Sequence, residues 1–290
     1  MNIQIIQSLC DGVLMGGVYA LAALGLSLIF GVMKITNFAH GALMTMGMYL
    51  IYQISFSFGI SPYLALPFSV VVMFVAGYVI QHYLIQPASK VNPQNQLLVT
   101  LGISIIIENL LLVIFTPDYK SVSVKGFEQA LFMGDLSFNK PKLIAFGVVI
   151  LITVAIYLVL YKTYIGKAVR AASMDTDGAQ LSGIVIKKIN AVAFGIGAVC
   201  TGIAGALLTP VIYINPTIGS TFQLKCFVIA VLGGMGNIFG ALVAGIIIGV
   251  VESVCSFLLG GSWSDMIIYL IFVFILLFKP SGIFSRRGDR

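Results

Sequence analysis

The sequence predicts an all-α integral membrane protein, a polytopic bundle of about eight transmembrane helices, with room for eight to ten at roughly 20 residues a span. Hydrophobic residues make up 59% of the 290 residues and charged residues only 9%, whereas a soluble domain is about a quarter charged. The apolar residues gather in long runs. Two of these runs are interrupted by glycine and asparagine, which predicts two broken or re-entrant helices.

Apolar runs between polar breaks predict the helices in chain order. The expected segments are 9–30, 41–58, 61–83, 96–115, 143–161, 189–213, 222–232, 238–259 and 265–278. Small residues recur four positions apart in two of them, as Gly12, Gly16 and Ala20 in the first and as Ala241, Gly245 and Gly249 near the end of the chain. This spacing lets helices approach closely in lipid, so both segments are expected to pack tightly. The polar segment over 116–142 is expected to be a loop.

The distribution of lysine and arginine predicts the orientation of the chain. Basic residues concentrate in the polar stretch 162–188 and in the C-terminal tail 285–290, and cytoplasmic segments carry an excess of Lys and Arg. Both are therefore expected inside and the N-terminus outside. The N-terminus lacks the basic region of a signal peptide, so the first span is expected to be retained. Because the basic residues lie at span ends, the net charge of +6 indicates membrane orientation and not nucleic-acid binding.

The stretch 162–188 is too polar to lie in lipid, where each charge costs about 3 kcal/mol or more. Small and apolar residues recur along it at helical spacing, while Arg170, Asp175 and Gln180 point elsewhere. We expect a helical segment at the cytoplasmic surface that a cytoplasmic partner holds. The alternative is an ordinary solvated loop between two spans.

The two interruptions resemble each other. Each has an apolar run, a glycine break, an asparagine and a helix start rich in small residues, and such paired breaks point to a transport path. The expected path residues are Asn37, Phe38, His40 and Gly41 in the first break and Gly233, Gly234, Met235, Gly236 and Asn237 in the second. The two breaks are expected to face each other across a central cavity. Ordinary turns with chance similarity are the alternative.

Asparagine before a helix is a good N-cap, so Asn37 and Asn237 are expected to cap the helices that follow them. His40 could line the first break or cap its helix, and capping is the favoured interpretation. Glu108 and Glu252 lie inside apolar segments, which makes them candidate functional carboxylates. A neutral or hydrogen-bonded packing role is the equal alternative for both.

Motifs for metal binding and catalysis are absent from the sequence. Four cysteines lie in or at the edge of apolar segments, without CxxC or Cys/His spacing, which favours small buried residues and no metal site: Cys10, Cys200, Cys226 and Cys255. No P-loop, GxSxG or HExxH motif occurs. Neither an ATPase site nor a catalytic site is therefore expected.

Three stretches together resemble one family. They are GGVYALAALGLSLIFGVMKITNFAHGALMTMGMY (Gly16–Tyr49), GKAVRAASMDTDGAQLSGI (Gly166–Ile184) and VLGGMGNIFGALVAGIIIGVVES (Val231–Ser253). In this order, and over nearly the whole chain, they are similar to the inner-membrane permease subunits of bacterial branched-chain amino acid ABC importers. The length matches the shorter of the two permease types in such importers.

The resemblance implies one permease domain over 1–290, in the bacterial inner membrane, without a cofactor. Its partners would be a second homologous permease, two cytoplasmic ATPase subunits and an extracytoplasmic substrate-binding protein. Its coupling segment to the ATPases would use Arg170, Asp175, Gly178, Gln180 and Gly183. The segment departs from the EAA-x₃-G signature of many importers, because Arg170-Ala171-Ala172 stands where Glu-Ala-Ala would. The coupling role therefore rests on the family and on location.

The function implied by the resemblance is a permease that forms the translocation path for branched-chain or other hydrophobic amino acids and is not itself an enzyme. The amides of Asn37 and Asn237 would then meet a zwitterionic substrate. The alternative is an ion-gradient-driven secondary transporter of a small polar solute, in which Glu108 and Glu252 would serve in the path.

Overall fold

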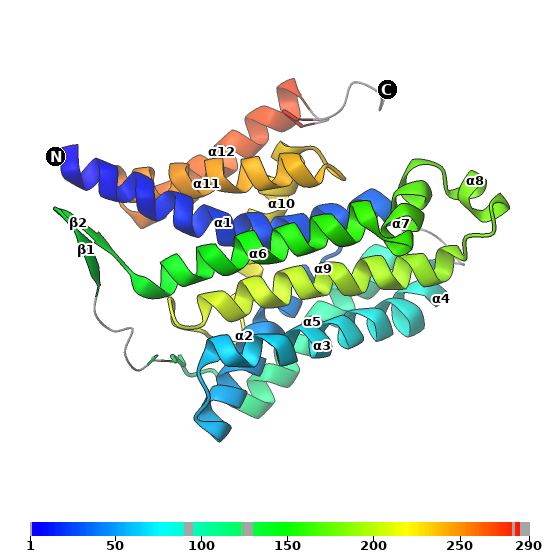
Figure 1. The fold of residues 1–290 in the computed structure, drawn as a ribbon, viewed down its shortest axis with the longest axis horizontal. Helices are drawn as coiled ribbons and strands as arrows, with labels where there is room; N and C mark the ends of the chain where they lie inside the picture. The colour runs from blue at the N-terminus through cyan, green and yellow to red at the C-terminus, as the bar shows by residue number, and fades with distance from the viewer. Residues whose placement is uncertain (1, 90–94, 123, 125–129, 280–281, 285–290) are drawn as a thin grey trace.

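The computed structural model describes residues 2–89, 95–122, 124, 130–279 and 282–284. Its long helices lie along a common axis, with the N-terminus and a small β-hairpin at one end and two short polar helices at the other (Figure 1). The helices are α1 (Asn2–Met33), α2 (His40–Phe58), α3 (Pro62–Val79), the π-helix η1 (Ile80–Ile85), α4 (Gln86–Ser89), α5 (Asn95–Phe115), α6 (Lys140–Lys162), α7 (Tyr164–Met174), α8 (Thr176–Leu181), α9 (Ile186–Leu208), α10 (Gly219–Gly233), α11 (Ile238–Leu259) and α12 (Gly261–Phe278).

Seven helical stretches in the described part of the chain are long and apolar enough to cross a membrane. They are α1, the continuous α3–η1–α4 segment, α5, α6, α9, α11 and α12, and α10 is a shorter apolar helix. The prediction of an all-α polytopic membrane protein of about eight spans is confirmed.

The bundle has an inner layer and an outer layer. α1 and α9 are buried along most of their length, whereas α3, α5, α6, α11 and α12 turn most of their surface outward. The outward side chains are large and apolar, as Leu98, Val113 and Leu151 illustrate. A helix that exposes such residues is stable only where lipid tails replace water. The inner pair is rich in glycine and alanine, which lets neighbouring backbones come close.

The two stripes of small residues form one antiparallel interface between α1 and α11. Gly12 packs against the backbone of Gly249 and Val250, and Gly16 against the backbone of Gly245. A Cβ added at Gly16 would lie 2.8 Å from the carbonyl oxygen of Gly245, closer than carbon and oxygen can approach without a backbone shift. The predicted tight packing of both segments is confirmed, and each stripe is the other's partner.

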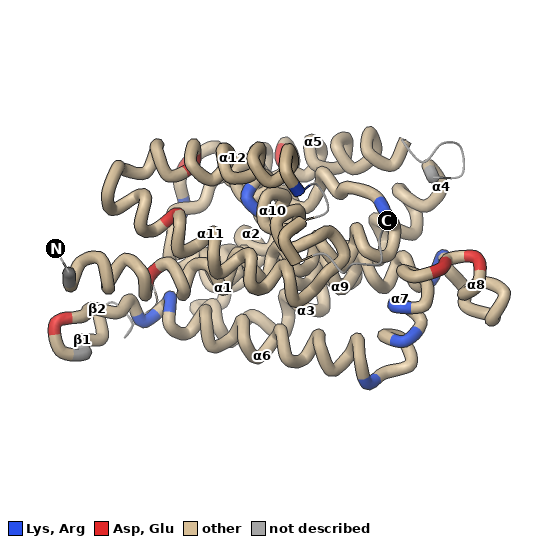
Figure 2. The backbone as a smooth tube through the Cα atoms, turned by 90° about the horizontal axis from the view of Figure 1, so that it is seen from above, with Lys and Arg blue, Asp and Glu red and all other residues tan. Residues whose placement is uncertain are grey.

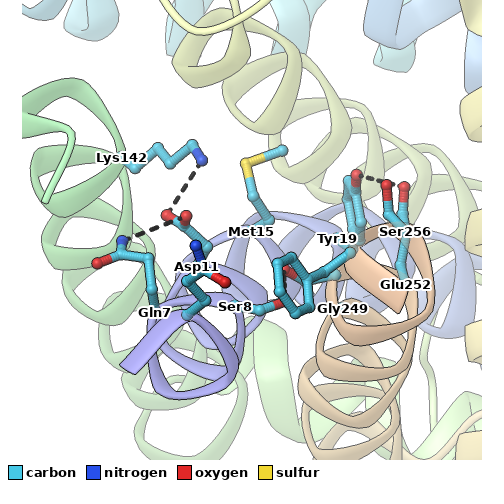
Figure 3. Close-up of a pocket in the computed structure, with 12 residues that line it drawn as sticks. Gln7, Ser8, Asp11, Met15, Tyr19, Lys142, Gly249, Glu252 and Ser256 are labelled. Atoms are coloured by element: carbon cyan, nitrogen blue, oxygen red, sulfur yellow. Dashed lines mark hydrogen bonds and ion pairs between the residues drawn. The ribbon is translucent and has the colours of Figure 1, made fainter. Parts of the chain in front are cut away.

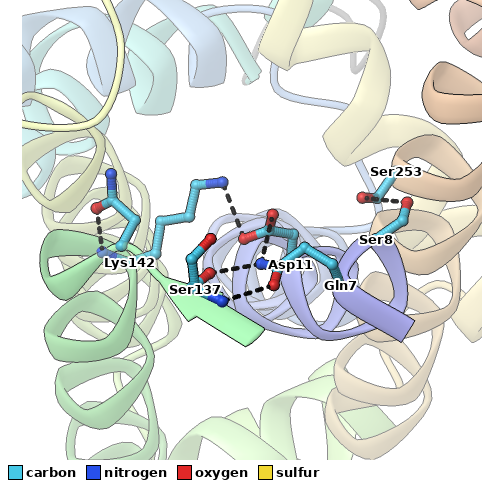
Figure 4. Close-up of polar contacts among 7 residues, drawn as sticks. Gln7, Ser8, Asp11, Ser137, Lys142 and Ser253 are labelled. Carbon is cyan, nitrogen blue, oxygen red and sulfur yellow. Dashed lines mark hydrogen bonds and ion pairs between the residues drawn. The ribbon is translucent and has the colours of Figure 1, made fainter. Parts of the chain in front are cut away.

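The segment expected to be only a loop contains a β-hairpin at the N-terminal end of the bundle (Figure 1). Strands β1 (Leu131–Met133) and β2 (Leu136–Phe138) pair antiparallel, with Leu131 opposite Phe138. The hairpin is held to α1 because the Gln7 side-chain amide donates to the Ser137 carbonyl (2.6 Å) and accepts from the Ser137 N–H (3.0 Å) (Figure 4). The strands are too short to be recognised as periodic patterns in the sequence.

Lysine and arginine residues gather around the ends of α6 and α7, opposite the N-terminal end of the bundle (Figure 2). This is the end that the charge distribution places inside. The basic tail 285–290 lies outside the described residues. At this end the expected single helical segment is two helices, because Asp175 leaves the helical conformation between α7 and α8 (φ −148°, ψ 106°).

Candidate translocation site

The first break returns the chain into the interior of the bundle. After α1 ends, Lys34 adopts left-handed backbone (φ 57°), and the imidazole Nε2 of His40 lies 2.9 Å from the carbonyl oxygen of Ala22, in the middle of α1. At 1.5 Å per residue, α2 therefore starts about 16 Å back along α1 from its end. Asn37 and His40 are fully buried. The first break is thus re-entrant, as the sequence predicts.

Neither side chain at the first break caps α2, which corrects the expectation for Asn37 and for His40. The N-cap residue is Ala39, whose methyl side chain cannot accept a hydrogen bond. The Asn37 side-chain oxygen instead accepts from the Ala39 N–H (3.0 Å), which makes a local turn before the helix. The His40 ring is used to join α2 to α1.

A glutamine of α10 satisfies the backbone groups that this break leaves open. The Gln223 side-chain oxygen accepts from the Gly41 N–H (2.6 Å), and its amide donates to the Asn37 carbonyl (3.1 Å). The starts of α2 and α10 meet here, with Gly41 against the backbone of Gly219. Non-helical backbone at membrane depth must be satisfied by protein, and Gln223 does this for the first break. Sequence reasoning missed Gln223, although a glutamine inside a short apolar run was a visible signal.

The second break connects α10 to α11. Gly234 and Gly236 have positive φ (83° and 90°), a backbone that glycine adopts without strain. Asn237 caps α11, since its side-chain oxygen accepts from the Gly240 N–H (3.1 Å), which confirms the expectation for this residue. Its amide donates to the Phe284 carbonyl (2.6 Å), so the C-terminal segment covers the break. Both polar atoms of the Asn237 side chain are therefore engaged within the protein.

The two breaks contact different parts of α1, the first through His40 and Ala22 and the second through Gly236 and Ser27. A cavity of about 320 Å³ is lined by Gly234–Asn237 together with Lys34 and Arg170, and Asn37–Gly41 are not among its lining residues. The second break also meets α1 at Gly31, which packs against the Cα of Gly236. Phe38 and Met235 are partly exposed, at 42% and 39%. That both breaks line one central path stays a prediction.

An ion cluster joins the last three helices. Lys225 of α10 lies 2.7 Å from Glu252 of α11 and 3.1 Å from Asp265 of α12. The Tyr19 hydroxyl of α1 also donates to Glu252 (3.4 Å). Lys225 is almost fully buried, and sequence reasoning missed it, although a lysine inside the apolar run 222–232 was the same kind of signal as Glu108 and Glu252.

The two candidate carboxylates have different surroundings. Glu252 belongs to this ion cluster. Glu108 on α5 is half-buried and makes no hydrogen bond or ion pair with any residue that the structure describes. Glu252 therefore has partners on other helices, whereas Glu108 has no contact that assigns it a role, and a functional role for either carboxylate stays a prediction.

The predicted coupling residues lie on and around α7 and α8, which we call the cytoplasmic helix pair after the side on which the charge distribution predicts them. The Asp175 carboxylate accepts from the N–H groups of Asp177 and Gly178 (both 3.1 Å) and so caps α8. A side chain on Gly178 would collide with that carboxylate. Gln180 and Gly183 are exposed, and Gly183 has a positive φ (84°) where the chain leaves α8. These residues shape and end α8, and the structure leaves Gln180 free to contact a partner.

Arg170 faces inward from α7. Its guanidinium stacks over the Tyr161 ring, 4.4 Å from the centroid, and lines the same cavity as the second break. Tyr161 in turn lies beside Phe239 at the start of α11, with ring centroids 6.5 Å apart. The structure thus brings the polar cytoplasmic helices and the second break together, which their separation in sequence did not reveal.

Comparison with known proteins relates this sequence to membrane permeases. Residues 8–276 match the family described as "Branched-chain amino acid transport system / permease component". The chain is 29% identical to the high-affinity branched-chain amino acid transport system permease protein BraD of Pseudomonas aeruginosa, covering 97% of this chain and 96% of that protein. The figures are the same for the corresponding protein LivH of Escherichia coli K12.

A probable branched-chain amino acid transport permease protein LivH of Methanocaldococcus jannaschii is 32% identical, over 91% of this chain and 87% of that protein. No solved structure matches the chain at a significant level. The family match covers nearly the whole bundle, including both breaks and the cytoplasmic helix pair. The chain therefore belongs to the family of permease components of branched-chain amino acid transport systems.

Proposed function

We propose that this chain is a membrane permease subunit of an ATP-driven importer that carries branched-chain or other hydrophobic amino acids into the cell. An extracytoplasmic binding protein would deliver the substrate, and cytoplasmic ATPase subunits would supply the energy, because this chain has no nucleotide motif of its own. A second, homologous permease would complete the path. The observation that carries the proposal is the match to the permease family over residues 8–276.

The cytoplasmic helix pair supports coupling to an ATPase. Met174 and Leu181 are 88% and 91% exposed at the end of the molecule where basic residues gather. Large apolar side chains that face water next to charged residues are typical of a surface that a partner covers. If an ATPase displaced α7, the movement would be transmitted to the second break through the contacts of Arg170 with Tyr161 and of Tyr161 with Phe239. That route gives ATP hydrolysis a way to reorient α11.

The test of the proposed function is uptake by the complete importer in proteoliposomes. Radiolabelled leucine should accumulate only when ATP, the ATPases, both permeases and the binding protein are present. Ionophores that collapse proton and sodium gradients should leave the uptake unchanged. Uptake driven by an ion gradient without ATP would overturn the proposal and favour the secondary transporter.

Docking of α8 can be tested with Leu181→Asp. Fully burying a leucine contributes roughly 1.5–3 kcal/mol, so placing a carboxylate there should weaken the ATPase contact by about tenfold or more. Stimulation of ATP hydrolysis by the permease should fall accordingly while the permease still inserts. Leu131→Asp, at an exposed position of the outer hairpin, is the matched control and should behave as wild type. Equal stimulation by both variants would contradict docking at α8.

A further inference from the structure

A second cavity lies at the outer end of the bundle, away from both breaks. It has a volume of about 460 Å³ and opens between the first turns of α1, the start of α6 and the outer half of α11 (Figure 3). Pockets that bind small molecules have volumes of roughly 300–1,000 Å³. The cavity is therefore large enough for an amino acid, and it lies on the side from which a binding protein would deliver one.

The mouth of the cavity carries a positive and a negative group. The Lys142 ammonium lies 3.1 Å from the Asp11 carboxylate, and both side chains are about one-quarter exposed. Gln7 donates to the same carboxylate (3.4 Å) and is itself held by the outer hairpin (Figure 4). An ammonium has three donors, and the structure uses one of them on Asp11. Lys142 can therefore accept a second anionic partner without leaving Asp11.

The inner wall of the cavity carries a carboxylate with one oxygen unused. The Oε1 atom of Glu252 accepts from Lys225 (2.7 Å) and from the Tyr19 hydroxyl (3.4 Å). Its Oε2 atom is buried and has no hydrogen-bond partner among the described residues. A buried carboxylate oxygen normally has a partner. Glu252 lines the cavity, and a small shift of its side chain would present this buried oxygen to an N–H donor that enters there.

Part of the remaining wall is apolar, beside the polar side chains of Gln4, Ser8, Ser253 and Ser256. Met15 and Phe257 line the cavity, and Gly249 adds no side chain that would fill it. An aliphatic side chain could lie against this wall while charged groups at its other end meet Lys142 and Glu252. The arrangement of one cation, one free carboxylate oxygen and an apolar wall matches a zwitterion with a branched aliphatic side chain.

We propose that this outer cavity is an entry site for the amino acid on its way from the binding protein into the permease. The substrate ammonium would donate to Glu252 Oε2, its carboxylate would accept from Lys142 Nζ, and its side chain would lie on Met15 and Phe257. This inference rests on the proposed function, because that function supplies the identity of the ligand as an amino acid. Binding is expected to be weak, with a Kd of millimolar order, since a transport intermediate must be released.

The test is protection of a single cysteine in the cavity. Ser256 lines the cavity and is exposed, so Ser256→Cys, in an importer whose four native cysteines are replaced, should react with a small hydrophilic thiol reagent. About 10 mM leucine, above a millimolar Kd, should slow the reaction several-fold. Leucinol, which lacks the carboxylate, and 4-methyl-2-oxopentanoate, which lacks the ammonium, should not. Asp135→Cys, on the hairpin turn outside the cavity, is the control and should react equally with and without leucine.

Two further substitutions assign the contacts. Glu252→Gln should abolish protection by leucine, whereas Glu108→Gln, the other intramembrane carboxylate, should leave it intact. Because Glu252→Gln also disturbs the ion cluster, Lys142→Met gives an independent check: leucine should then lose its advantage and protect no better than leucinol does. Equal protection by all three compounds in the parent protein would overturn the assignment of a zwitterion site.

The outcomes separate this inference from the proposed function. Absence of protection by leucine, in an importer that shows ATP-dependent leucine uptake, would overturn the entry site and leave the function standing. Protection by leucine in a protein whose uptake needs no ATP would support the site and overturn the ATP-driven importer.

Discussion

The partners of individual side chains determine where a charged or polar residue is tolerated inside this bundle. An unpaired lysine at the centre of a bilayer costs about 3 kcal/mol or more. Lys225 is tolerated because it meets Glu252 and Asp265, which come from two other helices. The same reasoning explains why Gln223, two positions earlier, faces the first break, where backbone groups need partners. Both residues interrupt an apolar run, and both have a partner that the run does not reveal.

At this scale we predict that Lys225→Met strongly destabilises the protein. Removing one partner of a buried ion pair leaves an uncompensated charge and costs about 3–5 kcal/mol, and here two carboxylates lose their cation. Lys142→Met, at the partly exposed pair with Asp11, should cost about 1 kcal/mol or less. Thermal unfolding of the purified permease compares them. Similar losses in the two variants would show that Lys225 does not hold the last three helices together.

Whole elements depend on how closely their backbones approach. The stripes on α1 and α11 bring the two helices together from Gly12 beside Val250 to Ala20 beside Gly245. Beyond the start of α11, Gly31 of α1 also lies beside Gly236 of the second break. Dispersion contacts and close packing drive helix association in lipid, because lipid tails remove the hydrophobic difference between helix and surroundings. α11 is therefore expected to move together with α1. A displacement at the second break would be transmitted along their interface.

The corresponding prediction is that Gly16→Val disrupts the α1–α11 interface. Valine would force the backbones apart, and overpacking of this kind costs about 1–3 kcal/mol. Gly102→Val is a suitable control, because a Cβ at Gly102 meets no atom within 4 Å. Folded yield and thermal stability in detergent provide the measurement. If Gly102→Val proved as harmful as Gly16→Val, the effect would come from valine itself and not from the interface.

The molecule as a whole has two chemically different ends. One end carries the β-hairpin, and the other carries α7 and α8 with the basic residues around them (Figures 1 and 2). Because cytoplasmic segments carry the excess of lysine and arginine, the hairpin is expected outside. The proposed entry cavity would then face outside, where the substrate is delivered, and the proposed coupling helices would face inside, where ATP is hydrolysed. This arrangement is the one that import requires.

Orientation can be measured with two single cysteines in a cysteine-free background. Asp135→Cys, in the hairpin turn, should react with an impermeant maleimide added to intact cells. Asp177→Cys, in α8, should react only in inverted vesicles. Both positions are exposed, so a difference between them reports the side of the membrane and not burial. The reverse pattern would place the N-terminus inside and would contradict the import direction.

Composition and local pattern were sufficient for the membrane class, the approximate positions of the helices, the two breaks and the role of Asn237 as a cap. Each depends on neighbours in the chain, since burial in lipid requires a long apolar run and a cap requires residues three positions apart. The resemblance to the permease family rested on three such local stretches. The division between α7 and α8 was missed because small and apolar residues continue at helical spacing on both sides of Asp175. This spacing hides the tendency of Asp175 to end one helix and cap the next.

Only the tertiary structure decided which segments meet. The first break is closed by Gln223, 186 positions from Asn37, and the Tyr19 hydroxyl reaches Glu252 over 233 positions. The outer cavity draws its groups from α1, α6 and α11, and the stripes of small residues pack against each other instead of against other helices. A residue's own sequence neighbourhood carries no information about such partners. Side-chain length, close backbone approach and the need to pair every buried polar group select them once the helices are assembled.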